Sequence, residues 1–174
     1  KKITLYTLLF LSFFISYFHA YKINALFDYG YILNTATRIV NGQIPYVDFF
    51  IPHQIGTFLV QSAIIKIFGF SFKATVIYIS ILNLLSLLLT FKIINFIHSE
   101  KLSLIFIAPL IFLGNTSIFS QPFYDSDTVF LILLSLYFVI LATFKSNFFV
   151  SIITGALLVL PFFIKINIGA PFVF

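Results

Sequence analysis

Residues 74–97 decide the fold, and they read ATVIYISILNLLSLLLTFKIINFI, with Lys92 as the single charged residue. A helix needs about 20 mostly apolar residues to cross a bilayer, so this stretch is long enough to span one. The rest of the chain is similar in character, because 61% of its 174 residues are hydrophobic and 9% are charged. Soluble domains carry about 25% charged residues. The composition therefore indicates an integral membrane protein.

Other apolar runs flank this stretch, and each is a candidate membrane span. The predicted spans are about 3–21, 74–97, 102–119, 128–144 and 148–164. No small-x-small cleavage site follows the first run, which favours a retained helix over a signal peptide. The chain starts at Lys1 and its last apolar run reaches Phe174, so we expect the N-terminal portion of a longer protein. The sequence thus predicts an all-α fold, a polytopic transmembrane helical bundle in which 1–174 form a single module.

A long polar segment, residues 22–73, follows the first span and interrupts the hydrophobicity. Within it, residues 30–41 have helical period, with polar and apolar side chains on opposite faces. A second helix is expected at about 53–68. Between the two, Pro45 and Pro52 push the residues before them towards extended geometry. We expect both to be interfacial helices that lie at the membrane surface with their apolar sides down.

Loop charge predicts the side of the membrane on which each loop lies. The N-terminal Lys1 and Lys2 and the basic short loops 98–101 and 145–147 are expected inside. The protein would then lie in the cytoplasmic membrane with its N-terminus in the cytoplasm. The segment 22–73 and the loop 120–127 would lie outside, on the active face. Four of the five acidic residues belong to these outer segments: Asp28, Asp48, Asp125 and Asp127.

The residue types also limit the chemistry. The chain has no Cys, which excludes a disulfide framework, a thiolate metal site and a thiol nucleophile. The Asp125-Ser126-Asp127 run has the form of a metal-binding D-x-D motif, but acids before a helix are usually N-caps. A divalent metal stays open as an alternative, but without a His or Glu partner at ligand spacing it has no support. No cofactor is therefore predicted.

Several short motifs follow one another in a defined order along the chain. Asp28 comes after the first span, and residues 36–48 read Ala-x-x-Ile-Val-x-Gly-x-x-Pro-Tyr-x-Asp. Pro-His at 52–53 and Phe-Gly at 68–69 bound the second polar helix, and Lys-x-Asn-x-Gly occupies 165–169. In order and spacing these motifs resemble the GT-C superfamily of membrane glycosyltransferases. The closest group is the bacterial protein-mannosyltransferase-like and aminoarabinose-transferase-like branch.

This resemblance implies an inverting transfer of a sugar from a polyprenyl-phosphate donor on the outer face. The acceptor would be a lipid, a glycan or a protein. Asp28 would be the general base, and it would act alone, because Tyr29 stands where many relatives have a second acid. The other expected site residues would bind substrate, and they are Arg38, Tyr46, Asp48, His53, Asp127 and Lys165.

Each of these residues also has a structural interpretation. Asp28 can flank or cap a helix, and Arg38 can snorkel to lipid headgroups. Asp48 can accept backbone N–H bonds that fix the linker. His53 stands at an expected helix start, a position at which a histidine is more often structural than functional. Lys165 lies among apolar residues, where a charge is costly unless it snorkels or meets an anion.

Two other classes of function stay open. A transporter or flippase for a lipid-linked substrate predicts polar groups at mid-span and paired helices broken by Gly or Pro. The span centres here are nearly all apolar, and only Pro109 and Pro161 hint at breaks. A non-catalytic membrane assembly subunit predicts that Asp28→Asn is harmless. Membrane lipids are expected partners in each case, and nucleic acid is not.

Overall fold

The computed structural model describes residues 2–22, 26–113, 121–145 and 147–173, and the chain is helical through most of these ranges. The helices are α1 (Lys2–Ala20), α2 (Leu26–Val40), α3 (Gly56–Phe68), α4 (Phe72–Ile97), α5 (Glu100–Ile107), α6 (Leu110–Leu113), α8 (Tyr124–Lys145), α9 (Phe148–Ile164) and α10 (Ile166–Val173). No strand occurs in the described ranges, although Pro45 and Phe49 form an isolated parallel β-bridge. The predicted all-α class is confirmed.

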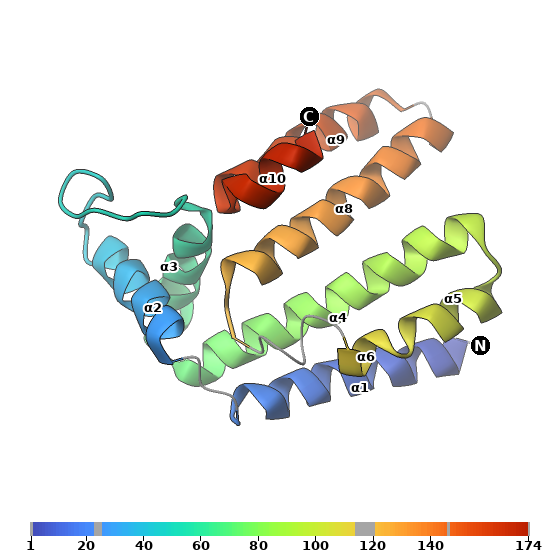
Figure 1. Ribbon diagram of the computed structural model, residues 1–174, viewed down its shortest axis with the longest axis horizontal. Helices are drawn as coiled ribbons and strands as arrows, with labels where there is room; N and C mark the ends of the chain where they lie inside the picture. The colour runs from blue at the N-terminus through green and yellow to red at the C-terminus, as the bar shows by residue number, and fades with distance from the viewer. Residues whose placement is uncertain (1, 23–25, 114–120, 146, 174) are drawn as a thin grey trace.

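Three of the described helices, α1, α4 and α8, are long and apolar enough to cross a membrane. The apolar helices α9 and α3 are shorter, with 17 and 13 residues. Packing joins α1 to α4, α4 to α8 and α8 to α9, so these four helices run side by side as one bundle (Figure 1). Many large apolar side chains on their outer sides are exposed, among them Phe10, Leu85 and Leu136. These features indicate a membrane protein.

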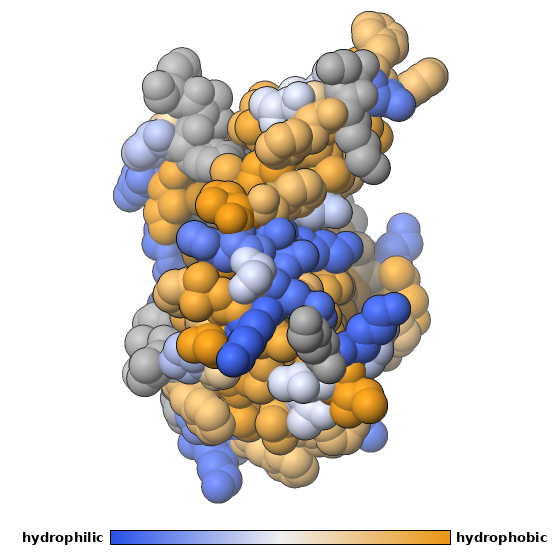
Figure 2. All heavy atoms as spheres, turned by 90° about the vertical axis from the view of Figure 1, so that its right-hand side faces the viewer, coloured by the Kyte–Doolittle hydropathy of each residue, from blue (hydrophilic) through white to orange (hydrophobic). Residues whose placement is uncertain are grey.

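The bundle has two different ends. At one end, which we call the α2–α3 end, α2 and α3 lie beside the starts of α4 and α8 and the turn between α9 and α10 (Figure 1). At the other, the α5 end, lie the starts of α1, α5 and α9. Figure 2 faces the α5 end and shows hydrophilic residues gathered there between apolar flanks. The four acids Asp28, Asp48, Asp125 and Asp127 all belong to segments at the α2–α3 end.

Polar side chains join the long helices to one another. Asn83 Nδ2 on α4 donates to Ser16 Oγ on α1 over 2.8 Å, and both residues are buried. Ser135 Oγ on α8 donates to the Leu157 carbonyl of α9 over 2.8 Å. Such bonds are typical between membrane helices, where a polar group has no water as an alternative partner. They fix the register of α1 on α4 and of α9 on α8.

The third predicted span, 102–119, differs from the structure. Instead of one helix, the chain forms α5 and then the short α6, and the break falls at Pro109. Proline lacks an N–H donor and its ring clashes with the preceding turn, so a helix rarely continues through it. The part of the prediction at 114–119 lies outside the described residues.

The chain turns back on itself after α9. α9 ends at Ile164, and α10 packs against both α9 and α8. Gly169 permits this close approach, because a Cβ there would lie 2.5 Å from backbone atoms of Pro161 and Phe162. The expected fifth span is therefore α9 followed by a closely packed return helix.

The two polar-segment helices have different starts from those predicted. α2 begins at Leu26 rather than at residue 30, so Asp28 lies in its first turn, where the helix dipole favours a negative charge. α3 begins at Gly56 rather than at residue 53. A Cβ at Gly56 would lie 2.8 Å from the Phe163 carbonyl oxygen, so a glycine lets α3 start against the end of α9.

Candidate functional site

A buried apolar cluster holds the α2–α3 end together. Its members come from separate segments of the chain, and they are Ile32, Ile51, Phe58, Tyr124 and Ile164. These residues belong to α2, the loop after it, α3, α8 and α9. The cluster therefore fixes the two shorter helices relative to the bundle, and the polar side chains around it form the candidate site.

Asp28 lies at the accessible edge of this cluster. Its carboxylate is exposed, and it lies near enough to the Tyr124 hydroxyl to act on it electrostatically. The hydroxyl of the next residue, Tyr29, is hydrogen-bonded to Thr75 Oγ1 on α4 over 2.6 Å, and burial raises the Tyr29 pKa. Tyr29 thus anchors α2 to α4.

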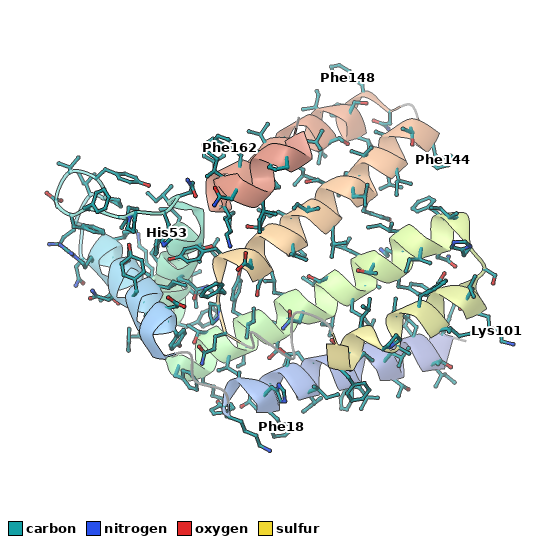
Figure 3. All side chains as sticks on the ribbon, viewed as in Figure 1. Phe18, His53, Lys101, Phe144, Phe148 and Phe162 are labelled. Carbon is teal, nitrogen blue, oxygen red and sulfur yellow. The ribbon has the colours of Figure 1, made fainter. Side chains whose placement is uncertain are left out.

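Aromatic residues surround the neighbouring loop. The His53 ring lies 4.8 Å from the Tyr124 ring and 6.3 Å from the Tyr31 ring, measured between centroids. Tyr46 Oη donates to the His53 carbonyl over 2.8 Å. Figure 3 shows His53 at the α2–α3 end of the molecule. Two predicted site residues, Tyr46 and His53, are therefore in contact with each other and close to Tyr124.

Two buried hydroxyls belong to this group, Tyr31 Oη and Tyr124 Oη. Tyr124 Oη finds no hydrogen-bond partner within the part of the chain that the structure describes. Burial also raises the Tyr31 pKa, which keeps this phenol in its neutral, hydrogen-donating form. Thr35, one turn along α2, opposes this rise through a hydrogen bond to the Tyr31 hydroxyl, so the Tyr124 hydroxyl is the clearer case of a buried polar group with no partner among the described residues.

Lys165 lies between α9 and α10 and pairs with Asp125. Its Nζ is 2.5 Å from Asp125 Oδ1, and the two side chains are 32% and 26% exposed. The backbone N–H of Ile166, at the start of α10, donates to Gln54 Oε1 over 3.3 Å. Asp125 follows Tyr124 directly, so the ion pair of Lys165 and the electrostatic contact of Asp28 both involve the first turn of α8.

Asp127 lies inside the protein rather than at an accessible site. It is 3% exposed, and it accepts hydrogen bonds from Thr57 Oγ1 over 2.7 Å and from Tyr78 Oη over 2.6 Å. Those two donors belong to α3 and α4, while Asp127 belongs to α8. We call these three residues the Asp127 clamp. The clamp joins α3 to the long helices α4 and α8.

Arg38 and Asp48 stabilise the loop after α2. Arg38 Nε donates to Gln43 Oε1 over 2.6 Å, and its guanidinium carbon lies 4.1 Å from the centre of the Phe49 ring. Asp48 Oδ2 accepts the backbone N–H of Ile44 over 2.6 Å. For Asp48 this matches the structural interpretation made from the sequence. Arg38 contacts its own loop.

Within the described residues, no group of three His, Cys, Asp or Glu side chains could hold a metal ion. Thr57, Tyr78 and Tyr124 were not among the predicted site residues. Thr57 lies on the polar side of a predicted helix, which is a weak signal. Tyr78 and Tyr124 lie in or beside apolar runs, and nothing local in the sequence distinguishes them from lipid-facing aromatic residues.

Comparisons with family models, with curated proteins and with solved structures found no match to this chain. The functional interpretation therefore depends on the chemistry of the site itself.

Proposed function

We propose that this protein is a membrane glycosyltransferase that uses a polyprenyl-phosphate sugar as donor. Its acceptor is a lipid, a glycan or a protein at the outer face of the cytoplasmic membrane. One observation supports this best: the exposed Asp28 acts electrostatically on Tyr124, and the cationic Lys165 pairs with the next residue of α8, Asp125. Transfer of a sugar from a phosphate needs a base and a positive charge of this kind.

In this mechanism Asp28 is the general base. The acceptor hydroxyl oxygen attacks the anomeric carbon from the side opposite the phosphate, and its proton passes to the Asp28 carboxylate. The bond between the anomeric carbon and the phosphate oxygen breaks, and the electron pair leaves with the polyprenyl phosphate. The configuration at the anomeric carbon is therefore inverted. The exposure of Asp28 gives an acceptor access to it.

Lys165 stabilises the negative charge that develops on the leaving phosphate. Its pairing with Asp125 lowers the cost of holding a lysine among the apolar residues of α9. Both partners are partly exposed, so a phosphate can reach Lys165 Nζ beside the carboxylate.

The apolar face of α2 packs against α3 inside the protein, whereas α3 keeps apolar side chains that suit contact with a membrane surface. Ile32, Leu33 and Ala36 of α2 are buried, as are Phe58 and Ile65 of α3. Exposed apolar side chains, including Leu59, Ile67 and Phe68, leave α3 with a further surface for lipid headgroups and upper acyl chains. A lipid-linked donor would then enter beside these helices, with its phosphate at the level of Lys165.

A transfer assay with purified protein and a radiolabelled polyprenyl-phosphate sugar tests this function. We expect Asp28→Asn to lower turnover by about 100-fold or more, the usual contribution of a general base. Glu100→Gln is the matched control, because it removes an acid at the opposite end of the bundle, and it should retain wild-type turnover. Normal transfer by Asp28→Asn would contradict the catalytic assignment and favour a non-catalytic subunit.

One observation favours the transporter or flippase alternative. The break between α9 and α10 at Lys165, with Pro161 in α9, resembles the discontinuous helices of transporters. A flippase would move a fluorescent lipid-linked sugar between the leaflets of proteoliposomes without cleaving it. Movement with no transfer product, unchanged by Asp28→Asn, would support this alternative over the glycosyltransferase.

A further inference from the structure

A groove lies between α1 and α5, near the α5 end and far from the candidate site. It has a volume of about 450 Å³. Its lining residues are Thr4 and Leu8 of α1, Lys101, Leu104 and Ile105 of α5, and Ala108 directly after α5. The last four have the i, i+3, i+4, i+7 spacing of one helix face. One side of α5 is therefore turned towards α1 across an open space.

The groove lies between α1 and α5 because both helices pack on α4 and α6 rather than directly on each other. Leu9 of α1 and Ile107 of α5 join the same buried cluster with Leu87 and Phe91 of α4. α1 packs mainly on α4 and reaches α6, while α5 packs on α4 and α6. The two helices thus meet a common partner, and their side chains leave the space between them unfilled towards the α5 end.

The mouth of the groove is positively charged. Lys101 lines it and is exposed, and Lys2 is exposed in the first turn of α1. Both helices begin at this end, so their dipoles add partial positive charge there. Glu100 is the acid next to Lys101 and is partly exposed. Figure 3 shows the Lys101 side chain at the α5 end, directed away from the bundle.

We propose that this groove binds a phospholipid with an anionic headgroup. One acyl chain lies along Leu8, Leu104 and Ile105, and the phosphate lies at Lys101. Apolar walls with a lysine at the mouth match an amphiphile that carries net negative charge, and basic pockets between membrane helices bind such headgroups. A zwitterionic lipid brings its own cation and gains less from Lys101. This site is independent of the proposed transferase site.

Native mass spectrometry of the whole chain in detergent, with equal amounts of phosphatidylglycerol and phosphatidylcholine, tests the groove. We expect wild type to retain phosphatidylglycerol about fivefold more than phosphatidylcholine, the factor expected for one lysine beside an anionic headgroup. Lys101→Gln should bring this ratio to about one. Lys92→Gln is the matched control, since Lys92 lies over the Tyr137 ring instead of in the groove, and it should keep the wild-type ratio.

A second variant tests the apolar part of the groove. Ala108→Phe fills the space while keeping Lys101, so it should lose retention of both lipids. Equal retention of the two lipids by wild type, or a Lys101→Gln ratio like that of wild type, would overturn the proposal. If Ala108→Phe fails to fold, as judged by size-exclusion chromatography, the comparison of Lys101→Gln with Lys92→Gln decides alone.

Discussion

At the scale of single residues, carboxylates of the same type have different surroundings. Asp28 is exposed, Asp125 is paired with Lys165, and Asp127 is buried beneath two hydroxyl donors. Asp125 and Asp127 are two positions apart, yet one faces a cation and the other faces α3 and α4. Asp28 is therefore accessible to a substrate, whereas Asp127 joins α3 and α4 to α8.

The Asp127 clamp is expected to be a large contributor to stability. Asp127→Ala leaves the hydroxyls of Thr57 and Tyr78 without their acceptor, and an unpaired buried polar group costs about 1–3 kcal/mol. We therefore expect the free energy of unfolding, measured by denaturant titration in mixed micelles, to fall by about 2–4 kcal/mol. Asp48→Ala, which removes an exposed acceptor, should cost about 1 kcal/mol or less. Equal losses in the two variants would mean that the clamp does not hold α3.

The Asp125–Lys165 pair allows charge and position to be separated. The double variant Asp125→Lys with Lys165→Asp keeps an ion pair across α8 and the α9–α10 turn but moves the cation to α8. We expect its thermal unfolding to lie within a few degrees of wild type, because partly exposed pairs contribute about 1 kcal/mol or less. The KM for the lipid-phosphate donor should rise about tenfold, the loss of one charge-assisted contact. An unchanged KM would show that Lys165 does not bind the phosphate.

At the scale of helices, the sequence predicts long regular elements well. Continuous apolar runs such as 74–97 and 148–164 fall within two residues of α4 and α9, since length and composition determine such helices. The early start of α2 was not predicted, and the break at Pro109, at which the sequence hints, lies inside what was predicted as one span, 102–119. Pro109 lies within an otherwise apolar run. At the start of α2, residues 26–29 precede the clear helical period of 30–41 and fit either a loop or a first helical turn. The packing of α10 on α9 depends on contacts between residues whose pairing no local pattern encodes.

The α9–α10 turn depends on Gly169. Gly169→Ala would place a Cβ against the backbone of Pro161 and Phe162, which cannot move aside as a flexible side chain could. Overpacking of this kind costs about 1–3 kcal/mol, so hydrogen exchange of the amides in 166–173 should become faster. Gly155→Ala on α9 is the control, because no atom lies within 4 Å of its Cβ position. Equal exchange in the two variants would contradict the close packing.

At the scale of the whole molecule, the distribution of charge was the most useful prediction. The sequence places four acids in segments expected on one side, and the structure brings all four to the α2–α3 end. The contacts within that end were not predictable. Thr57 and Tyr78 reach Asp127 from 70 and 49 residues away, and such long-range partners leave no signal in the periodicity of one chain. The site could therefore be located roughly, but the buried and accessible carboxylates could not be told apart.

The turnover number of Asp28→Asn at saturating polyprenyl-phosphate sugar separates catalysis from structure. If Asp28 is the base, kcat falls by about 100-fold or more, while donor binding and thermal unfolding stay at wild-type values. Asparagine keeps the shape of the side chain but cannot take the acceptor proton. A kcat within twofold of wild type at saturating donor would contradict the assignment of the α2–α3 end as a glycosyltransferase site.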